Sequence, residues 1–344
     1  MMRAVTHNHT FTISAESTNS EFKTTLRDYQ GLINTRIKSF LNTREPANLY
    51  EPIKYVLESG GKRIRPILLI FACEALGGDA AASLDAALAV ELLHNFTLVH
   101  DDIMDQDDTR RGLPTVHAKW DSDVALLAGD GLVSLAYKAL LQTRSPRVHE
   151  IAQIFTSGIL DLCEGQALDS DFENRNGVSL DDYLRMISKK TARLLNICTK
   201  IGGIIGGGSK SQIHFLGEFG HNLGCAFQIQ DDLLDIISDE QTLGKKSGSD
   251  INRKKQTYLL VHAFSHADMQ TRQLLMQTLN NSATLRLRIS KMKKLFKEIG
   301  SIEAAKRAID NFLISAKANL RELPASLGRE NLSHLLHFIA ARKA

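Results

Sequence analysis

The feature that most constrains the fold of this chain is the spacing of its apolar residues, which recur every three or four positions over long stretches. Six prolines in 344 residues and the lack of alternating β-branched runs argue against a β-sheet. An apolar content of 43% is enough to bury one large core. We therefore predict an all-α fold, built as a single-domain helical bundle.

Two of the predicted helices are long and end in acidic residues. The first covers residues 83–108, with Ser83 as the candidate N-cap and an apolar face made of Leu84, Leu88, Leu92, Phe96, Val99 and Ile103. The second covers residues 213–237, with an apolar face made of Phe215, Phe219, Leu223, Phe227 and Leu234. The two segments share only this layout, because the sequence has no repeat of fixed period.

Composition separates the first residues from the rest of the chain. Residues 1–20 are rich in Thr, Ser, Asn and His and carry few apolar residues in register, which indicates a flexible extension. Turn signals punctuate residues 21–344, but none of them marks a domain boundary. We expect one folded domain over residues 21–344.

Charge and cysteine content exclude several classes of protein. A net charge of +3 over 344 residues, without a basic block interleaved with aromatics, argues against nucleic-acid binding. Four cysteines without a C-x-x-C pair suggest neither a disulfide framework nor a zinc site, and they fit a reducing compartment. No run reaches the roughly 18 apolar residues of a spanning helix and no signal peptide is apparent, so we expect a cytoplasmic protein without a membrane span.

Both acidic helix ends carry the pattern Asp-Asp-x-x-Asp, at residues 101–105 and 231–235. Three carboxylates at this spacing fan over one helical turn and repel one another until cations neutralise them. Mg²⁺ suits such a site because it takes one or two carboxylates and completes its shell with water and phosphate oxygens. One copy alone is equally well explained as a solvated helix end. Two copies, each after an apolar or small helical stretch, indicate a central cavity with an acidic rim, which suits an amphiphile with a diphosphate head.

Basic residues accompany the acidic patterns along the chain. They follow the glycine pair 60–61, follow the first acidic pattern directly, and recur later, as Lys62, Arg63, Arg65, Arg110, Arg111, Lys190, Lys245, Lys246, Lys254 and Lys255. Arginine suits a diphosphate because its planar fork bonds two phosphate oxygens at once. Taken singly, each cation is explained as a solvated charge. Their order along the chain argues for a second diphosphate site.

In this order of motifs the chain resembles the trans-isoprenyl diphosphate synthases, also called the polyprenyl synthetase family. The resemblance covers about residues 50–260 through G-G-K-R-I-R-P, H-N-F-T-L-V-H-D-D-I-M-D with R-R-G, K-T, G-C-A-F-Q-I-Q-D-D-L-L-D, G-K and K-x-T. It implies the all-helical isoprenoid-synthase fold around a central cavity, a homodimer, and a catalytic domain over residues 21–344. It also implies the addition of isopentenyl diphosphate to allylic diphosphates.

The resemblance assigns roles to the residues that match the family's motifs. It implies three Mg²⁺ ions, with Mn²⁺ as a substitute, held by Asp101, Asp102, Asp105, Asp231 and Asp235, with Asp232 close by as support. It implies contacts to the allylic diphosphate from Arg110, Lys190, Thr191, Gln228, Lys245 and Lys255. It implies contacts to isopentenyl diphosphate from Lys62, Arg65, His94 and Arg111. The expected catalytic set is Asp101, Asp102, Asp231, Lys190 and Arg110, whereas Arg63 matches no assigned contact.

Two residues before the first acidic pattern bear on the length of the product. In the family, an aromatic residue at the fifth position before the pattern and a small one at the fourth, as in Phe96 and Thr97, resemble synthases with a C20 product. Helix geometry decides less, because Thr97 shares the face of Asp101 whereas Phe96 lies about 140° away and also fits an ordinary core position. We expect C20 geranylgeranyl diphosphate, with C15 farnesyl diphosphate and longer chains as alternatives.

Two other classes of protein share parts of this pattern. A terpene cyclase would need one Asp-rich helix but not the basic segment 60–65 for isopentenyl diphosphate. A regulatory subunit that has kept the fold and lost catalysis is expected to lack one Asp pattern, and here both are complete. The motifs therefore favour a catalytic prenyltransferase, while its preferred allylic primer stays open.

Overall fold

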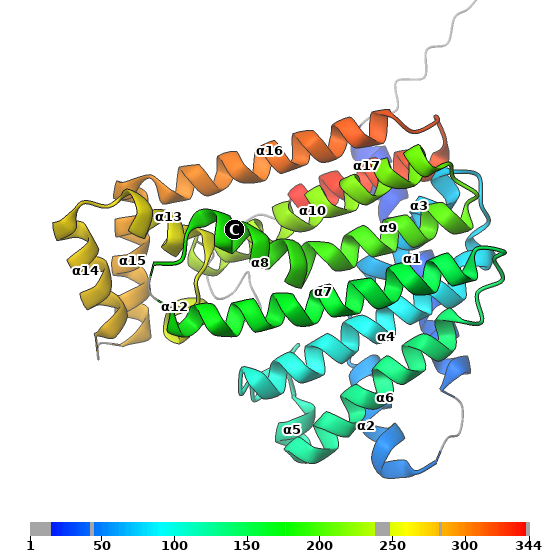
Figure 1. The fold of residues 1–344 in the computed structure, drawn as a ribbon, viewed down its shortest axis with the longest axis horizontal. Coiled ribbons are helices and arrows are strands. Elements are labelled where there is room, and N and C mark those ends of the chain that lie inside the picture. Colours follow the sequence, from blue (N-terminus) through cyan, green and yellow to red (C-terminus); the bar gives the residue numbers. More distant parts are fainter. Residues whose placement is uncertain (1–14, 42–44, 176, 238–247, 282–283, 342–344) are drawn as a thin grey trace, which may run out of the picture.

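The computed structural model describes residues 15–41, 45–175, 177–237, 248–281 and 284–341. Most of these residues are helical, so the predicted all-α class is confirmed (Figure 1). The helices of the first half are α1 (Ala15–Phe40), α2 (Ala47–Glu58), α3 (Ile64–Ala75), α4 (Ala80–Met104), α5 (Val116–Lys119), α6 (Ser122–Leu140) and α7 (Val148–Asn174). Those of the second half are α8 (Leu180–Ile187), the π-helix η1 (Ser188–Ala192), α9 (Arg193–Ile205), α10 (Lys210–Ile237), α12 (Ser249–Arg253), α13 (Tyr258–His266), α14 (Met269–Asn280), α15 (Leu285–Ile299), α16 (Ser301–Arg321) and α17 (Leu327–Ala340). Two short strands, β1 (Thr109–Arg110) and β2 (Leu113–Pro114), pair antiparallel just after α4.

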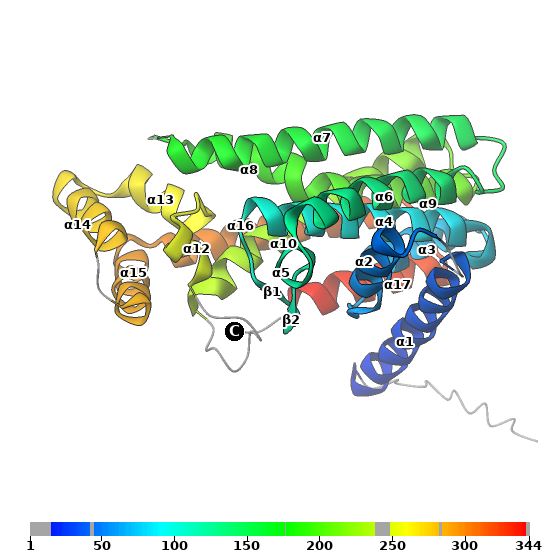
Figure 2. The ribbon, with the colours of Figure 1, turned by 90° about the horizontal axis from the view of Figure 1, so that it is seen from below.

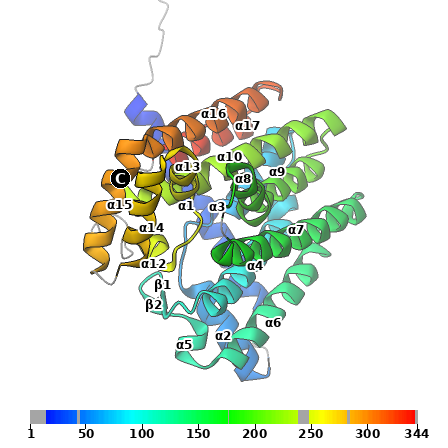
Figure 3. The ribbon, with the colours of Figure 1, turned by 60° about the vertical axis from the view of Figure 1, so that its left-hand side comes forward.

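The long helices lie side by side along the long axis of the molecule (Figure 1). Helix α10 packs against α9, η1 and α16, and α4 packs against α3 and α6. Figures 2 and 3 show the same arrangement from two further directions, with α7 along one side of the bundle. Helices α12 to α15 gather at one end of the molecule, and the ends of α4 and α10 that carry the acidic patterns approach α12 there.

Two hydrophobic clusters fill the bundle. The first is built mainly by α1 to α7, α9 and α17 and includes the fully buried Phe71 and Phe155. The second is built mainly by α8 and α13 to α16 and includes the fully buried Phe296. Helix α10 contributes Phe219 to the first cluster and Ile229 to the second. It therefore joins the two halves of the core and holds its acidic end in a fixed place.

The boundaries of the two acidic helices differ from the prediction at one helix and agree closely at the other. Helix α4 begins three residues before Ser83 because Asp79 is the N-cap and accepts a hydrogen bond from the backbone N of Ala81 at 3.2 Å. Ser83 is fully buried inside the first turn, where its hydroxyl donates to the carbonyl of Ala80 at 2.8 Å. The predicted N-cap was therefore wrong. Helix α4 also ends at Met104, four residues before the predicted end at residue 108, whereas α10 covers Lys210–Ile237 and ends where predicted.

Part of the predicted flexible extension is helical. Helix α1 begins at Ala15, so residues 15–20 belong to it, and residues 1–14 lie outside the described part of the chain. The ring of Phe22, which is 5% exposed, lies 5.4 Å from that of His334 and 6.4 Å from that of Phe71. This contact fixes one turn of α1, and extending an existing helix costs little, so α1 continues beyond the residues that pack.

A π-helical turn, η1, joins α8 to α9 in one continuous run of helix. Glycines face it from two sides. A Cβ atom on Gly165 of α7 would lie 2.3 Å from the backbone N of Lys190, and one on Gly224 of α10 would lie 2.4 Å from the Cα of Ala192. Because any side chain would clash there, the backbones of α7 and α10 approach η1 closely. Single π-turns of this kind occur frequently at functional sites.

Helix α4 is long and apolar enough, by length and composition, to cross a membrane, and no other helix of the described segments is. Its most apolar window is 61% buried inside the protein. Residues such as Leu88 and Leu92 lie in the first hydrophobic cluster. The helix is therefore explained as a core helix of the bundle.

Candidate active site

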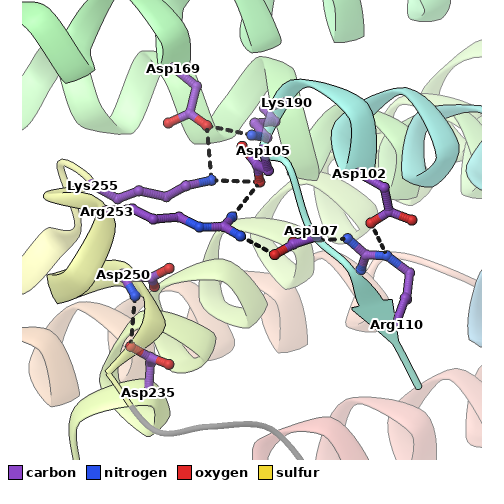
Figure 4. Close-up of polar contacts among 10 residues, drawn as sticks. All are labelled: Asp102, Asp105, Asp107, Arg110, Asp169, Lys190, Asp235, Asp250, Arg253 and Lys255. Atoms are coloured by element: carbon purple, nitrogen blue, oxygen red, sulfur yellow. Dashed lines mark hydrogen bonds and ion pairs between the residues drawn. The ribbon is translucent and has the colours of Figure 1, made fainter. Parts of the chain in front are cut away.

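The first acidic pattern lies at the end of α4, and two of its carboxylates contact cations from different segments (Figure 4). Asp102 accepts a hydrogen bond from Nε of Arg110 at 2.5 Å. Asp105 is the C-cap residue, and its Oδ2 lies 3.0 Å from Nζ of Lys255 and 3.0 Å from Nη1 of Arg253. The carboxylates are therefore neutralised on two sides of the same helix end.

Burial and neighbouring charge act in opposite directions on this pattern. Burial raises the pKa of Asp101, and the charge of Lys190 opposes that rise. Burial also raises the pKa of Asp102, to about 6, in spite of its contact with Arg110. Burial acts upward on the pKa of Asp105 as well, but the charges of Lys255 and Arg253 outweigh it and lower that pKa. The pattern is thus a set of partly desolvated carboxylates stabilised by positive charge.

The second acidic pattern, at the end of α10, presents one carboxylate to neutral donors. Asp232 is 4% exposed and accepts hydrogen bonds from the hydroxyl of Tyr183 at 2.7 Å, from Nε2 of Gln228 at 2.9 Å and from the backbone N of Tyr258 at 2.9 Å. Burial raises its pKa to about 7. Asp232 is therefore turned into the protein, whereas its neighbour Asp231 is partly exposed.

The short helix α12 connects the two acidic patterns (Figure 4). Its first turn reaches α10, where the backbone N of Asp250 donates to Oδ2 of Asp235 at 3.3 Å. Its last residue, Arg253, pairs with Asp105 and with Asp107 just beyond α4. The two patterns, which are 130 positions apart in the sequence, therefore belong to one site.

Asp169 of α7 lies between two of the predicted allylic-diphosphate contacts (Figure 4). It is 7% exposed and accepts a hydrogen bond from Nζ of Lys190, while Nζ of Lys255 lies 3.9 Å from the same carboxylate oxygen. Lys190 stands on the π-turn that packs against Gly165. The structure thus brings Lys190 and Lys255 together beside Asp105.

Thr191 and Gln228 stand on neighbouring helices and contact each other. The hydroxyl of Thr191 donates to Oε1 of Gln228 at 2.8 Å, and the amide nitrogen of Gln228 donates to Asp232. This pair links η1 to the second acidic pattern. The remaining predicted contact, Lys245, lies outside the described residues.

The residues expected to bind isopentenyl diphosphate gather around the start of α3. Nη1 of Arg65 lies 3.1 Å from Nε2 of His94, and Nη1 of Arg111 donates to the carbonyl of Gly60. Lys62 is exposed on the same loop. Burial, and then the charges of Arg65 and Arg111, keep the pKa of His94 well below its usual range. His94 is therefore neutral near pH 7 and accepts the hydrogen bond from Arg65.

Residues 46–299 match the family model for polyprenyl synthetase. This range contains the site residues described above. The chain belongs to the polyprenyl synthetase family. Family membership confirms the resemblance inferred from the motifs. It also agrees with the all-helical fold, since the crystal structure of a polyprenyl synthetase from Streptomyces coelicolor superimposes on 92% of this chain and 99% of that one, with a TM-score of 0.83 and 27% identity.

Individual relatives cover nearly the whole chain. It is 39% identical over 319 residues to a short chain isoprenyl diphosphate synthase of Methanothermobacter thermautotrophicus, an alignment that covers 92% of this chain and 98% of the relative. It is 39% identical over 317 residues to a geranylgeranyl diphosphate synthase of Saccharolobus solfataricus, with 90% and 95% covered. The crystal structure of a geranylgeranyl pyrophosphate synthetase from Pyrococcus horikoshii has a TM-score of 0.90 and 38% identity, over 95% of this chain and 100% of that one.

Sequence reasoning missed two residues that shape this polyprenyl synthetase site, Asp169 and Arg253. Asp169 lies in the last two turns of α7 close to Asp171 and Glu173, and the sequence alone does not distinguish it from these two exposed acids. Arg253 precedes two lysines that were noticed, and its contacts with Asp105 and Asp107 span about 150 positions. Both acquire their partners only through tertiary packing.

The two residues expected to limit product length are half-buried on α4. The ring of Phe96 packs edge-on against the imidazole of His100, with centroids 4.7 Å apart. The hydroxyl of Thr97 donates to the carbonyl of His94 at 2.8 Å. Phe96 also packs against the first hydrophobic cluster, so it contacts both the core and the helix face below the acidic pattern.

The carboxylates of the site fit Mg²⁺ better than a tightly enclosed metal. Over the described ranges, no three His, Cys, Asp or Glu side chains converge to hold one metal ion. A structural zinc site needs such convergence, whereas Mg²⁺ takes one or two carboxylates and keeps water or phosphate oxygens as its other ligands. Asp101 and Asp105 on α4 and Asp231 and Asp235 on α10 offer carboxylates of this kind around one site.

Proposed function

We propose that this chain is a Mg²⁺-dependent prenyltransferase that adds isopentenyl diphosphate to allylic diphosphates and makes an all-trans C20 product. The observation that carries the proposal is the pairing of acidic and basic side chains in one site, where Asp105 of α4 contacts Lys255 and Arg253. A site with acids alone would bind metal, and one with cations alone would bind phosphate. The two together suit a metal-bridged diphosphate.

The allylic diphosphate would be held by Lys190, Lys255 and Arg110, with Lys245, Thr191 and Gln228 completing the predicted set. Mg²⁺ held by the Asp residues, with Mn²⁺ as a substitute, would supply Lewis-acid withdrawal of charge from the leaving diphosphate. The lysines and Arg110 would stabilise the negative charge that develops there as the allylic C–O bond ionises. Asp169 and Asp105 keep the two lysines aimed at this place before substrate arrives.

Isopentenyl diphosphate would bind at Lys62, Arg65, His94 and Arg111. Nε of Arg65 is buried and has no hydrogen-bond partner among the described residues, so it is a donor available to a ligand. Held there, the isopentenyl double bond would attack the allylic carbocation, since binding both substrates replaces a bimolecular encounter by an oriented reaction. The described side chains offer no evident base for the final proton, and we assign that role to the departing pyrophosphate.

A C20 product is supported by the side chains before the first acidic pattern and by relatives such as the geranylgeranyl diphosphate synthase of Saccharolobus solfataricus. The rings of Phe96 and His100, five residues and one residue before Asp101, pack edge-on against each other. A growing chain that runs along this face of α4 would stop at such a pair. C15 and longer products remain the alternatives that the assay below distinguishes.

We also propose a homodimer in the cytoplasm. Exposed leucines on α6 and α7, with Leu126, Leu127 and Leu160 each more than half exposed, offer an apolar surface for a second copy. All four cysteines are free, which supports a reducing compartment. Light scattering after size-exclusion chromatography would test the dimer, and a monomer at micromolar concentration would contradict it.

The experiment that tests the function is incubation with labelled isopentenyl diphosphate, Mg²⁺ and C5, C10 or C15 allylic primers, followed by chain-length analysis. We expect a C20 product with at least one primer and no turnover after chelation of the metal. Lack of product with all three primers would reject the enzyme and favour a non-catalytic subunit of the same fold.

A further inference from the structure

Arg63, which matches no assigned family contact, forms a buried ion pair beside the residues expected to bind isopentenyl diphosphate. Arg63 is 5% exposed and Glu91 is 2% exposed, and Nη1 of Arg63 lies 2.5 Å from Oε1 of Glu91. The same guanidinium donates from Nε to Oδ1 of Asn34 at 3.0 Å and from Nη2 to the carbonyl of Leu57 at 2.5 Å. One side chain therefore ties the loop before α3 to α1, α2 and α4.

The backbone at Arg63 needs such a clamp. Its φ is 51°, in the left-handed region that residues with a side chain rarely adopt, and it is the N-cap of α3. A conformation of this kind persists only where the surroundings determine it. The neighbouring glycines are held as well, because Gln30 donates to the carbonyl of Gly61 at 2.7 Å and Arg111 donates to that of Gly60. Lys62 and Arg65 flank this clamped residue in the sequence.

Glu91 extends the network along α4 toward the first acidic pattern. Nδ2 of Asn95 donates to Oε1 of Glu91 at 3.2 Å and to its backbone carbonyl at 2.8 Å. Asn95 is fully buried, and its Oδ1 has no hydrogen-bond partner among the described residues. Asn95 also lines a cavity of about 30 Å³, together with Asp102, Arg110 and Arg111. Through this cavity Asn95 comes near two of the predicted diphosphate contacts, Arg110 and Arg111.

The negative charge of Glu91 also acts on two nearby cations, Arg65 and Arg111. Burial lowers the pKa of Arg65 and of Arg111, and the negative charge of Glu91 opposes the shift in both. Arg63, Arg65 and Arg111 repel one another, so without this charge they would be held together less firmly. A frame that fixes them before substrate binds reduces the cost of ordering them on binding.

We propose that Arg63, Glu91 and Asn95 are positioning residues for isopentenyl diphosphate. They hold Lys62, Arg65 and Arg111 in place, and Asn95 brings the network to the cavity that Arg110 and Arg111 also line. The inference rests on the proposed function for the assignment of the ligand. It adds residues that touch neither substrate and that act only through the cations.

The test compares two double variants that each remove a charged pair involving an acid of α4. Arg63→Met with Glu91→Gln removes the buried pair without leaving one charge unpaired, which is the change that buried ion pairs tolerate best. Arg36→Met with Asp85→Asn is the control. Arg36 and Asp85 lie 2.5 Å apart and join α1 to α4, away from the residues expected to bind isopentenyl diphosphate. Kd for isopentenyl diphosphate is measured by calorimetry, and KM for each substrate is measured in the condensation assay.

We expect the Arg63→Met/Glu91→Gln variant to raise Kd and KM for isopentenyl diphosphate about ten- to a hundredfold, as small misplacements of binding groups do, with KM for the allylic diphosphate within about twofold of wild type. The control variant should leave both constants unchanged. Unchanged Kd for isopentenyl diphosphate in the folded test variant, or an equal rise in both KM values, would overturn the proposal. If the double variant does not fold, Asn95→Ala carries the same expectation at about threefold, and unchanged constants there overturn it.

The binding measurement separates this inference from the proposed function. A wild-type chain that binds isopentenyl diphosphate and yields no product would contradict the proposed function, while the comparison of Kd values would still decide on the network. A wild-type chain that does not bind isopentenyl diphosphate would reject both.

Discussion

The two Asp-Asp-x-x-Asp patterns have the same sequence layout and different surroundings. At the end of α4, Asp102 and Asp105 contact Arg110, Lys255 and Arg253. At the end of α10, Asp232 contacts only neutral donors, namely a tyrosine hydroxyl, an amide and a backbone N–H. The central carboxylate is therefore stabilised by an arginine in the first pattern and by neutral hydrogen-bond donors in the second.

This difference separates groups that can exchange partners from groups that cannot. Long lysine and arginine side chains reach Asp102 and Asp105 from β1, from the end of α12 and from the segment after it, and they can move to a diphosphate when metal neutralises the carboxylates. The donors to Asp232 are set by the buried ring of Tyr183 and by the backbone of α13, so they stay in place. The central Asp of each pattern is thus the residue that differs most between the two sites.

The largest expected effect comes from residues that both patterns share. Asp101→Asn and Asp231→Asn should each lower turnover about 10²- to 10³-fold, because each removes a carboxylate that helps to stabilise charge on the leaving diphosphate. Steady-state turnover with saturating Mg²⁺ measures the effect, and circular dichroism checks the fold. Asp130→Asn, an exposed acid on α6, is the control. Turnover within threefold of wild type in either test variant would contradict the assignment.

A smaller effect is expected from the acid that holds the lysines beside the first pattern. Asp169→Asn removes the carboxylate that holds Lys190 and Lys255, so KM for the allylic diphosphate should rise about tenfold as the two lysines lose their position. KM is measured at saturating isopentenyl diphosphate. Asp171→Asn, two positions later and exposed on the same helix, should change nothing. An equal effect of the two substitutions would show that only the charge of α7 matters.

Removing a neutral donor to Asp232 should lower the free energy of unfolding more than it lowers turnover. Tyr183→Phe removes one of three hydrogen bonds to Asp232 and should lower the free energy of unfolding by about 1–2 kcal/mol. Urea denaturation measures this loss, and turnover of the folded variant should stay within about threefold of wild type. Tyr137→Phe removes an exposed hydroxyl contact with Thr156 and should cost much less. A large loss of turnover in Tyr183→Phe would show that Asp232 takes part in catalysis.

The smallest change in rate is expected from the apolar residues before each pattern. Phe96→Ala should lengthen the main product by at least one C5 unit, because it removes the ring that packs on His100. Thin-layer or mass analysis of the product measures the length. Phe227→Ala, four positions before Asp231, is the matched variant on α10 and should leave the length unchanged. Lengthening by both substitutions would place the end of the cavity between the two helices.

The sequence predicted those parts of the site that depend on local spacing. Asp101 and Asp105 recur at helical spacing before a polar segment, so their helix could be inferred from the chain alone, although it ends at Met104 and not at residue 108. The start of α4 was placed wrongly at Ser83, because Ser and Asp are both good N-caps and only packing decides that Ser83 is buried in the first turn.

The parts that escaped prediction depend on long-range packing. Asp169 acquires its contact with Lys190 only when η1 packs against α7, and the π-turn itself has no strong signal in the sequence. The network of Arg63, Glu91 and Asn95 was missed for a similar reason, since a buried charged residue looks like a surface charge until its partners are known.

The π-turn that carries Lys190 also limits how this enzyme can be changed. A π-turn places one more residue in the helix than α-helical winding would, so deleting one residue from 188–192 would let α8 and α9 join as regular helix. That shorter helix would be easier to form, and α8 and α9 would keep their relative orientation because the π-turn absorbs the extra residue, but the side chains within the turn would change direction. Lys190 and Thr191 would then face away from Asp169 or Gln228. Engineering for thermal stability should therefore leave this irregular turn intact.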